Sequence, residues 1–313
     1  MDTPQKIQLF LKGLAMGAAD VVPGVSGGTI AFITGIYGRL LAAINRFDLT
    51  ALKLLKSAKF SELLRHVDAG FLLILGSGIL ISILSLAKVV TWTLLHYPEP
   101  LWSFFAGLIL ASSWFVLKEV EQWRFLEKLL MLLGILLAYL ISAAVPVELD
   151  KNQWMIFLSG AIAICAMILP GVSGSFILLL LGMYTYILEA VHQFNFSILT
   201  IFAAGCIVGL MSFSKFLSHM LDKYTSQTLA ILTGFLIGAL YKVWPWKMTI
   251  VYRLSSDGSQ MPLVQTNVMP AAYTDLTGLS PQLGLCFTTF VVGFILVSLI
   301  ARNAPDNTQL HTK

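Results

Sequence analysis

The feature that most constrains the fold of this chain is a short Pro-Gly motif that occurs twice. It reads Pro-Gly-Val-Ser-Gly-Gly over residues 23–28 and Pro-Gly-Val-Ser-Gly-Ser over residues 170–175, each time within an apolar stretch. Proline ends a helix because it lacks an N–H, and glycine lets backbone approach a ligand closely. Irregular backbone is not tolerated against lipid, since its N–H and C=O groups would stay unpaired. We therefore expect both motifs to be helix breaks that line a cavity or are buried in protein.

Composition indicates an integral membrane protein. Hydrophobic residues make up 57% and charged residues 12% of the 313-residue chain, and the mean hydropathy is +0.83. This excludes a soluble domain, and we expect no nucleic-acid partner. The cysteines Cys165, Cys206 and Cys286 all lie in apolar segments, which predicts neither a disulfide framework nor a metal site. We expect no cofactor, and the sequence indicates no particular oligomeric state.

Hydropathy predicts six membrane-spanning helices and two re-entrant hairpins. A span needs ~20 residues to cross ~30 Å of hydrocarbon. The predicted spans lie near residues 70–96, 101–118, 128–146, 197–221, 227–244 and 282–301. The stretches 7–44 and 154–192 are each split by a Pro-Gly motif into short halves, so we predict that each enters and leaves on one face of the membrane.

The duplication extends well beyond the motif. Many residues of the segment 13–43 recur at a constant offset of 147 in the segment 160–190, and further matches follow at an offset of 127. Each repeat then holds a hairpin and three spans, and an odd number of crossings inverts the second repeat relative to the first. The predicted fold is an all-α polytopic membrane protein built from two inverted repeats, 1–146 and 147–302, with a tail at 303–313.

Loop charges predict that both chain ends are cytoplasmic, because cytoplasmic loops carry an excess of Lys and Arg. The predicted inner loops and tail hold Arg46, Lys53, Lys56, Lys59, Arg65, Lys118, Arg124, Lys128, Lys223 and Arg302. The predicted outer loops hold Lys151, Lys242, Lys247 and Arg253.

The linker at 48–67 is either an amphipathic helix on the inner surface or a solvated connector. In the outer loop at 245–280, residues 248–254 and 260–265 are predicted to form a β-hairpin, which either acts as a lid or packs against the rest of the protein.

The two breaks predict an anion site. The helix that leaves each break begins near Gly28 or Ser175, and its unpaired N–H groups attract an anion such as phosphate. A kink or a tight helix crossing is the alternative for a single break, but two copies favour a functional site. The candidate ligands are Gly24, Ser26, Gly27, Gly28, Thr29, Gly171, Ser173, Gly174 and Ser175.

Charged residues inside the apolar segments add candidates. Lys88 and Lys215 are equivalent in the two repeats, and a charge within a span is expensive without a partner or a watery path. Inverted repeats are typical of secondary transporters, so we expect one lysine in each vestibule of an alternating-access cycle. Snorkelling to headgroups is the alternative. Arg39 belongs to the site or anchors a hairpin end. Asp20 and Glu189 have no counterpart of like charge and are candidates for coupling to a proton or sodium gradient.

An enzyme is the weaker interpretation. Residues 24–28 fit G-x-S-x-G, and both motifs fit the shorter G-x-S-G found around intramembrane serine nucleophiles. A nucleophile needs a single positioned base, yet here the serine is duplicated and no histidine is equivalent in the two halves. We therefore expect no enzymatic activity.

The motifs resemble a known family. The segment 17–31 followed by Gly35-Ile36-Tyr37 is similar to the signature of bacterial polyprenyl-phosphate transporters, long known as a membrane domain of unknown function. The segment 168–175 with Gly182-Met183-Tyr184 resembles the second signature of that family, with Ser175 where a strict repeat would have glycine. The resemblance covers essentially the whole chain.

The resemblance implies a function. It implies a multi-pass protein of the bacterial inner membrane that returns the phosphate headgroup of undecaprenyl phosphate from the outer to the inner leaflet, for reuse in cell-envelope synthesis. A lipid phosphate as substrate agrees with the residues, because the breaks and lysines suit the anionic head while the tail stays in the bilayer. A transporter or channel for a small soluble anion is the alternative.

Overall fold

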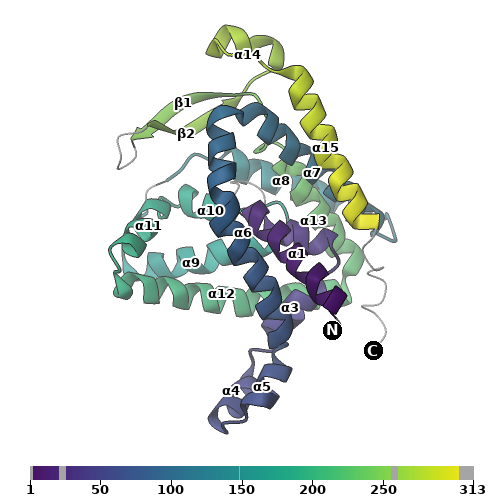
Figure 1. Ribbon diagram of the computed structural model, residues 1–313, viewed down its shortest axis with the longest axis vertical. Coiled ribbons are helices and arrows are strands. Elements are labelled where there is room, and N and C mark those ends of the chain that lie inside the picture. The colour runs from purple at the N-terminus through teal and green to yellow at the C-terminus, as the bar shows by residue number, and fades with distance from the viewer. Residues whose placement is uncertain (1–2, 21–25, 148, 255–259, 303–313) are drawn as a thin grey trace.

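The computed structural model describes residues 3–20, 26–147, 149–254 and 260–302 and is mostly helical (Figure 1). The first half forms α1 (Thr3–Asp20), α2 (Gly27–Ile33), α3 (Tyr37–Asn45), α4 (Leu49–Lys56), α5 (Phe60–His66), α6 (Ala69–His96), α7 (Pro98–Lys118) and α8 (Phe125–Ala143). The second half forms α9 (Gln153–Ile168), α10 (Gly174–Leu180), α11 (Tyr184–His192), α12 (Phe196–Lys223), α13 (Thr225–Ala239), β1 (Lys247–Leu254), β2 (Gln260–Asn267), α14 (Pro270–Thr277) and α15 (Leu283–Arg302).

Several helices are long and apolar enough to cross a membrane. Among the described residues, 5 helices meet this test, namely α6, α7, α8, α12 and α15, and the number rises to 7 if the bent pairs α2–α3 and α10–α11 each count as one span. Their outer faces carry exposed apolar side chains such as Leu84, Phe125 and Phe287, at 76%, 81% and 71% relative exposure. Such surfaces suit lipid, so the chain is a multi-pass membrane protein.

The predicted span at 227–244 is shorter than expected. It corresponds to α13, which has 15 residues and ends at Ala239. At 1.5 Å per residue this helix is about 22 Å long, less than the ~30 Å of the hydrocarbon core. The chain then turns, and the carbonyls of the turn are bonded by side chains: Asn267 Nδ2 donates to Tyr241 O over 2.8 Å and Lys247 Nζ donates to Lys242 O over 2.6 Å. The prediction from hydropathy included the apolar residues of this turn in the span because hydropathy does not detect where a helix ends.

Each predicted hairpin contains a second bend that the sequence analysis missed. After the break, α2 and α3 meet at 115°, and α10 and α11 meet at 109°. Gly35 and Gly182 sit at these bends with φ of 71° and 66°, the left-handed region that glycine adopts without strain. The amide after each glycine bonds back to the carbonyl five residues earlier, over 3.0 Å and 2.9 Å. The two bends are therefore matching helix C-caps.

Glycines join the helices in pairs. Helix α1 packs on α6 and α9 packs on α12, while α8 packs on α13 and α7 packs on α15. A Cβ atom at Gly13 or Gly78 would collide with the facing backbone of α6 or α1, and the equivalent Gly160 and Gly205 do the same between α9 and α12. Close backbone approach through small residues is typical of membrane helices. Part of the repeated sequence thus serves helix packing.

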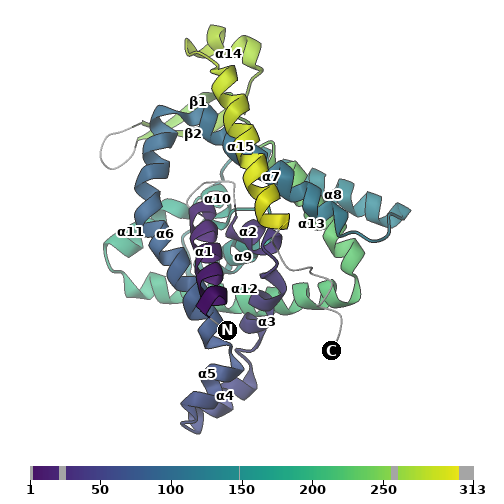
Figure 2. The same ribbon diagram turned by 45° about the vertical axis from the view of Figure 1, so that its right-hand side comes forward.

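The helix breaks lie at the centre of the molecule. Figure 2 shows α2, α9 and α10 between α6 on one side and α7, α8 and α13 on the other. All seven residues of α2 are buried. The core around it holds fully buried side chains such as Phe71, Ile109 and Leu236.

Two appendages lie at opposite ends of the molecule (Figure 1). At one end β1 and β2 pair antiparallel, which confirms the predicted hairpin. Next to it, the Tyr273 hydroxyl of α14 donates to the buried Glu99 of α7. At the other end α4 and α5 protrude from the body as two short helices, so the linker at 48–67 is helical, as one of its two interpretations required.

Candidate functional site

The two helix breaks meet, and the start of α2 is bonded to the end of α9. Ser26 Oγ donates to Met167 O over 2.9 Å. The Tyr37 hydroxyl, at the second bend of the same hairpin, donates to Ile168 O over 3.0 Å. Both acceptors belong to the last turn of α9, whose carbonyls have no partner within their own helix. Hydroxyl groups of the first repeat therefore satisfy the helix end that leads into the second break.

A third bond and a close approach complete this junction. Gly171 N, within the second break, donates to Thr29 Oγ1 over 3.1 Å. A Cβ atom at Gly28 would lie only 2.6 Å from Ile168 O, so glycine is needed there for the two hairpins to touch. Ser26 and Thr29 are each only 1% exposed. The predicted site residues Ser26, Gly28 and Thr29 of the first break thus contact the second break or the helix that leads into it. Gly24 lies outside the described residues.

The first break carries its own anion. Ser26 is the N-cap of α2, and its Oγ accepts from Gly28 N over 3.1 Å. Asp20 Oδ1, at the end of α1, accepts from Gly27 N over 2.7 Å. A carboxylate at a helix start is favoured by the partial positive charge of the N–H groups there. The position that the sequence analysis assigned to phosphate is therefore held in this repeat by Asp20.

The second break differs from the first. Ser173 is the N-cap of α10, but its Oγ accepts from Phe176 N over a long 3.5 Å. The hydroxyls of Ser173 and Ser175 lie 2.9 Å apart, and Ser175 is exposed. Met167 stands where a repeat of Asp20 would be, so the equivalent side chain here is uncharged. The second break is therefore the more open of the two.

Lys242 lies beside the second break, which the sequence analysis missed. Its Nζ lies 3.9 Å from the centre of the Phe176 ring, and it lines a cavity of about 10 Å³ together with Ser142, Gly171 and Ser173. Burial lowers the pKa of Lys242 to about 8. The distribution of loop charges predicts this residue in an outer loop. It was the one Lys within the predicted span 227–244, and the argument applied to Lys88 would have singled it out.

Lys247 supports Lys242 from β1. Lys247 Nζ donates to Lys242 O over 2.6 Å and lies 3.7 Å from the centre of the Trp102 ring. Burial, together with the neighbouring charge of Lys242, lowers the pKa of Lys247 well below its usual value. The β-hairpin thus contributes a second amino group behind the one that faces the break.

Lys88 and Lys215 are not brought to the breaks. Both side chains are exposed on the long helices α6 and α12. Within the part of the chain that the structure describes, neither makes an ion pair. Their positions agree with the snorkelling alternative, and their role in a vestibule stays a prediction.

The remaining charged candidates also lie away from the breaks. Arg39 Nε pairs with Asp68 Oδ2 over 2.8 Å, and its guanidinium lies 4.5 Å from the Phe71 ring centre. This contact ties α3 to the start of α6, which agrees with an anchor at a hairpin end. Glu189 is exposed on α11.

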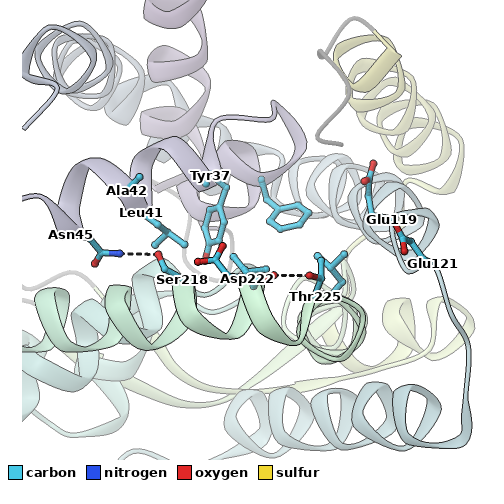
Figure 3. A pocket seen from close by; sticks show the side chains of 13 residues that line it. Tyr37, Leu41, Ala42, Asn45, Glu119, Glu121, Ser218, Asp222 and Thr225 are labelled. Carbon is cyan, nitrogen blue, oxygen red and sulfur yellow. Dashed lines mark hydrogen bonds between the residues drawn. The ribbon is translucent and has the colours of Figure 1, made fainter. Parts of the chain in front are cut away.

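A larger cavity opens beside the first hairpin (Figure 3). It has a volume of about 450 Å³ and lies among α2, α3, α12, α13 and the turn after α7. Phe32, Tyr37, Leu41, Leu221 and Leu229 are among its apolar lining residues, and its polar lining includes Asn45, Ser218, Thr225, Glu119, Glu121 and Asp222. The carboxylates disfavour a bound anion. No local motif predicted this cavity, because its walls come from three separate stretches of sequence, 32–45, 119–121 and 218–229.

Comparisons with known proteins show the family of this chain. A family model described as "Undecaprenyl phosphate translocase-like" matches residues 16–261. A polyprenyl-phosphate transporter of Vibrio cholerae is 48% identical over 94% of this chain and 96% of its own length. Another of the same name from Staphylococcus aureus is 32% identical over 75% of this chain and 85% of its own length. No solved structure gives a significant match. The chain therefore belongs to the undecaprenyl phosphate translocase-like family of membrane proteins.

Proposed function

We propose that this protein moves the phosphate headgroup of a polyprenyl phosphate across the bacterial inner membrane, from the outer to the inner leaflet. The observation that carries the proposal is the junction of two helix breaks at the centre of an apolar protein. Two similar proteins named polyprenyl-phosphate transporters match 94% and 75% of the chain and support the choice of substrate.

The chemistry of the junction suits such a substrate. A lipid phosphate needs polar groups for its head within the membrane and an apolar surface for its tail. The breaks supply hydroxyl and N–H groups, with Ser173 and the exposed Ser175 at the more open end. The tail stays against the apolar outer faces of the long helices while the head crosses.

The crossing follows an alternating-access cycle between two inverted repeats. The helix pairs support this proposal, since α1–α6 corresponds to α9–α12 and α7–α15 corresponds to α13–α8 in the duplicated sequence. Each repeat thus lends helices to the packing of the other. We place both chain ends and the α4–α5 protrusion in the cytoplasm and the β-hairpin outside, in agreement with the distribution of Lys and Arg.

Coupling to an ion gradient is assigned to Asp20. Its carboxylate already accepts from Gly27 N in the first break, so its protonation or its binding of a cation changes the junction directly. Glu189 is exposed on α11 and has no such contact with a break. A proton or sodium gradient is therefore the proposed energy source, and no cofactor is required.

Transport without catalysis is also favoured by the serines. Ser26 Oγ donates its proton to the carbonyl of Met167 and accepts from Gly28 N, so it is engaged in backbone contacts. A serine nucleophile instead needs a base within hydrogen-bond reach. The duplicated serines act as helix caps in both repeats.

The test measures headgroup transfer in proteoliposomes that hold the purified full-length protein and a polyprenyl phosphate. A membrane-impermeant phosphatase added outside hydrolyses only the outer-leaflet pool unless the protein brings the inner pool out. We expect hydrolysis of both pools with wild type, and of the outer pool alone with Ser26→Ala plus Ser173→Ala. A second double variant, Lys88→Gln plus Lys215→Gln, tests the predicted vestibule role of these lysines, and we expect it to keep transport because both lysines are exposed.

Two results would contradict the proposal or part of it. If wild type leaves the inner pool protected under every ion gradient but dissipates a gradient of a small anion, the protein is a small-anion transporter. If the Lys88 and Lys215 double variant loses transport while its fold is intact, the two lysines belong to the pathway as the sequence predicted.

A further inference from the structure

The second break and the turn after α13 place a cation next to hydroxyl groups. Lys242 comes from a turn far along the sequence, yet it shares a small cavity with Ser173 and Ser142. Its Nζ rests on the Phe176 ring at 3.9 Å, and Phe176 lies in the first turn of α10. The ammonium group is therefore held within the second break, not in an outer loop.

The positive charge at this place is not balanced by the protein. Within residues 3–20, 26–147, 149–254 and 260–302, no Asp or Glu lies within salt-bridge distance of Lys242 or Lys247. Instead the ammonium groups lie against aromatic rings, and Lys247 donates to the backbone carbonyl of Lys242. A partly buried ammonium group at Lys242 without a neighbouring carboxylate favours the arrival of an anion.

The two repeats differ in a way that supports the same conclusion. In the first break Asp20 accepts from Gly27 N, so an anion of the protein itself is already in place. In the second break Met167 replaces that carboxylate, and Lys242 adds a positive charge. A phosphate that met both breaks would be repelled at the first and attracted at the second.

We propose that Lys242 is the residue that binds the phosphate monoester at the second break, with the hydroxyls of Ser173 and Ser175 as its partners and Lys247 as a positioning residue. The identity of the lipid in this inference rests on the proposed function. The binding of a phosphate group rests only on the geometry of the site. A site on this side of the junction receives the headgroup that enters from the β-hairpin side.

Binding requires a local rearrangement of one side chain. The cavity of about 10 Å³ has room for about one water molecule. A phosphate fits once the Lys242 ammonium leaves the Phe176 ring and turns toward the exposed Ser175. This exchange is favourable because a charge-assisted hydrogen bond to phosphate is stronger than a contact with an aromatic face. Lys247 keeps the turn in place through its bond to Lys242 O.

The first experiment measures binding to the full-length protein in detergent micelles. The probes are farnesyl phosphate, which carries a short polyprenyl tail, and inorganic phosphate. We expect Lys242→Gln to weaken binding of farnesyl phosphate by about 10- to 100-fold, and Lys242→Arg to retain most of it. Lys151→Gln is the matched control, since Lys151 also lies near an aromatic ring, 5.3 Å from the centre of Tyr186, but away from the breaks. Equal dissociation constants for wild type and Lys242→Gln would overturn the inference.

A second measurement needs no variant and therefore does not depend on whether Lys242→Gln folds. Lysines of the wild-type protein are acetylated with a small amine-reactive reagent, with and without farnesyl phosphate, and the extent of labelling of each lysine is compared by mass spectrometry. The inference predicts protection of Lys242 and unchanged labelling of Lys151. Equal labelling of Lys242 in both conditions refutes it.

The outcomes separate this inference from the proposed function. If wild type transports the lipid but Lys242→Gln binds farnesyl phosphate normally, the inference fails and the function stands. If binding depends on Lys242 but vesicles show no lipid transfer, the phosphate site stands and the function fails. Tighter binding of farnesyl phosphate than of inorganic phosphate assigns the site to a lipid headgroup, and equal affinities assign it to free phosphate.

Discussion

Replacing Gly28 by alanine tests the contact between the two hairpins directly. The added Cβ would lie 2.6 Å from Ile168 O and 3.2 Å from Met167 O. Both neighbours are backbone atoms at the end of α9, so no flexible side chain can move aside. The first contact must lengthen by roughly 0.5 Å or more, which separates the start of α2 from α9. The bonds of Ser26 and Tyr37 to the same two carbonyls lengthen with it.

The expected loss of stability follows from these contacts. Overpacking of this kind costs about 1–3 kcal/mol, and each weakened hydrogen bond contributes about 0.5–1.5 kcal/mol. Alanine returns up to about 1 kcal/mol through its higher helix propensity. We therefore expect Gly28→Ala to lower the free energy of unfolding by about 3 kcal/mol. Gly76→Ala in α6 is the matched control, since a Cβ there meets nothing within 4 Å and the helix gains propensity without strain.

The assay is equilibrium unfolding in mixed micelles, with lipid transfer measured on the same preparations. Gly76→Ala should be as stable as wild type or more so and fully active, whereas Gly28→Ala should unfold earlier and transfer little lipid. If both variants match wild type in stability and transport, the hairpins do not touch through Gly28 and the central junction is wrong.

Three further predictions concern individual side chains. Ser26→Ala should lower the free energy of unfolding by about 2 kcal/mol, and Ser173→Ala should lower it by less than about 1 kcal/mol. The reason is that Ser26 bonds across to α9 over 2.9 Å, whereas the backbone contact of Ser173 is 3.5 Å long. Unfolding midpoints of the two variants check this order. Affinity for farnesyl phosphate should fall as pH rises through about 8, where Lys242 loses its proton, and Lys242→Arg should remove this dependence. Binding measured at about pH 7 and about pH 9 tests this prediction, since the phosphate is largely a dianion at both values. The Arg39–Asp68 pair should couple by less than about 1 kcal/mol in a double-mutant cycle, since Arg39 is 44% exposed, and Arg39→Gln should leave transport unchanged.

Local signals in the sequence predicted most elements of the fold. Apolar stretches of sufficient length became α6, α7, α8, α12 and α15, and the alternating pattern around Ser255 to Gly258 predicted the strands on either side, although those four residues lie outside the described ones. The Pro-Gly motifs also predicted breaks at the right places. These features depend on neighbours along the chain, so a single sequence reveals them.

Features that depend on distant contacts were harder to predict. The bends at Gly35 and Gly182 had a visible signal, a Gly and a Tyr two residues apart in both repeats, but it was taken only as part of the duplication. The end of α13 depends on bonds from the β-hairpin, and the place of Lys242 depends on α10. Hydropathy contains none of this information.

Sequence symmetry proved an incomplete guide to the site. Gly13 and Gly160 recur because helices pack closely there, and Lys88 and Lys215 recur on exposed faces. Conversely, the residues that distinguish the two breaks, Asp20 in the first and Lys242 beside the second, are the ones that do not recur. Recurrence alone therefore does not separate packing residues from residues of the breaks.

The two sides of the junction differ in the contacts that close them. Toward the 450 Å³ cavity, Tyr37 lines the cavity, and its hydroxyl bonds to the end of α9 (Figure 3). Toward the β-hairpin, the side chains of Lys247 and Asn267 bond to carbonyls of the turn after α13. We expect water to exchange with the end of α9 faster from the cavity side, where the contact of Tyr37 is a single hydrogen bond.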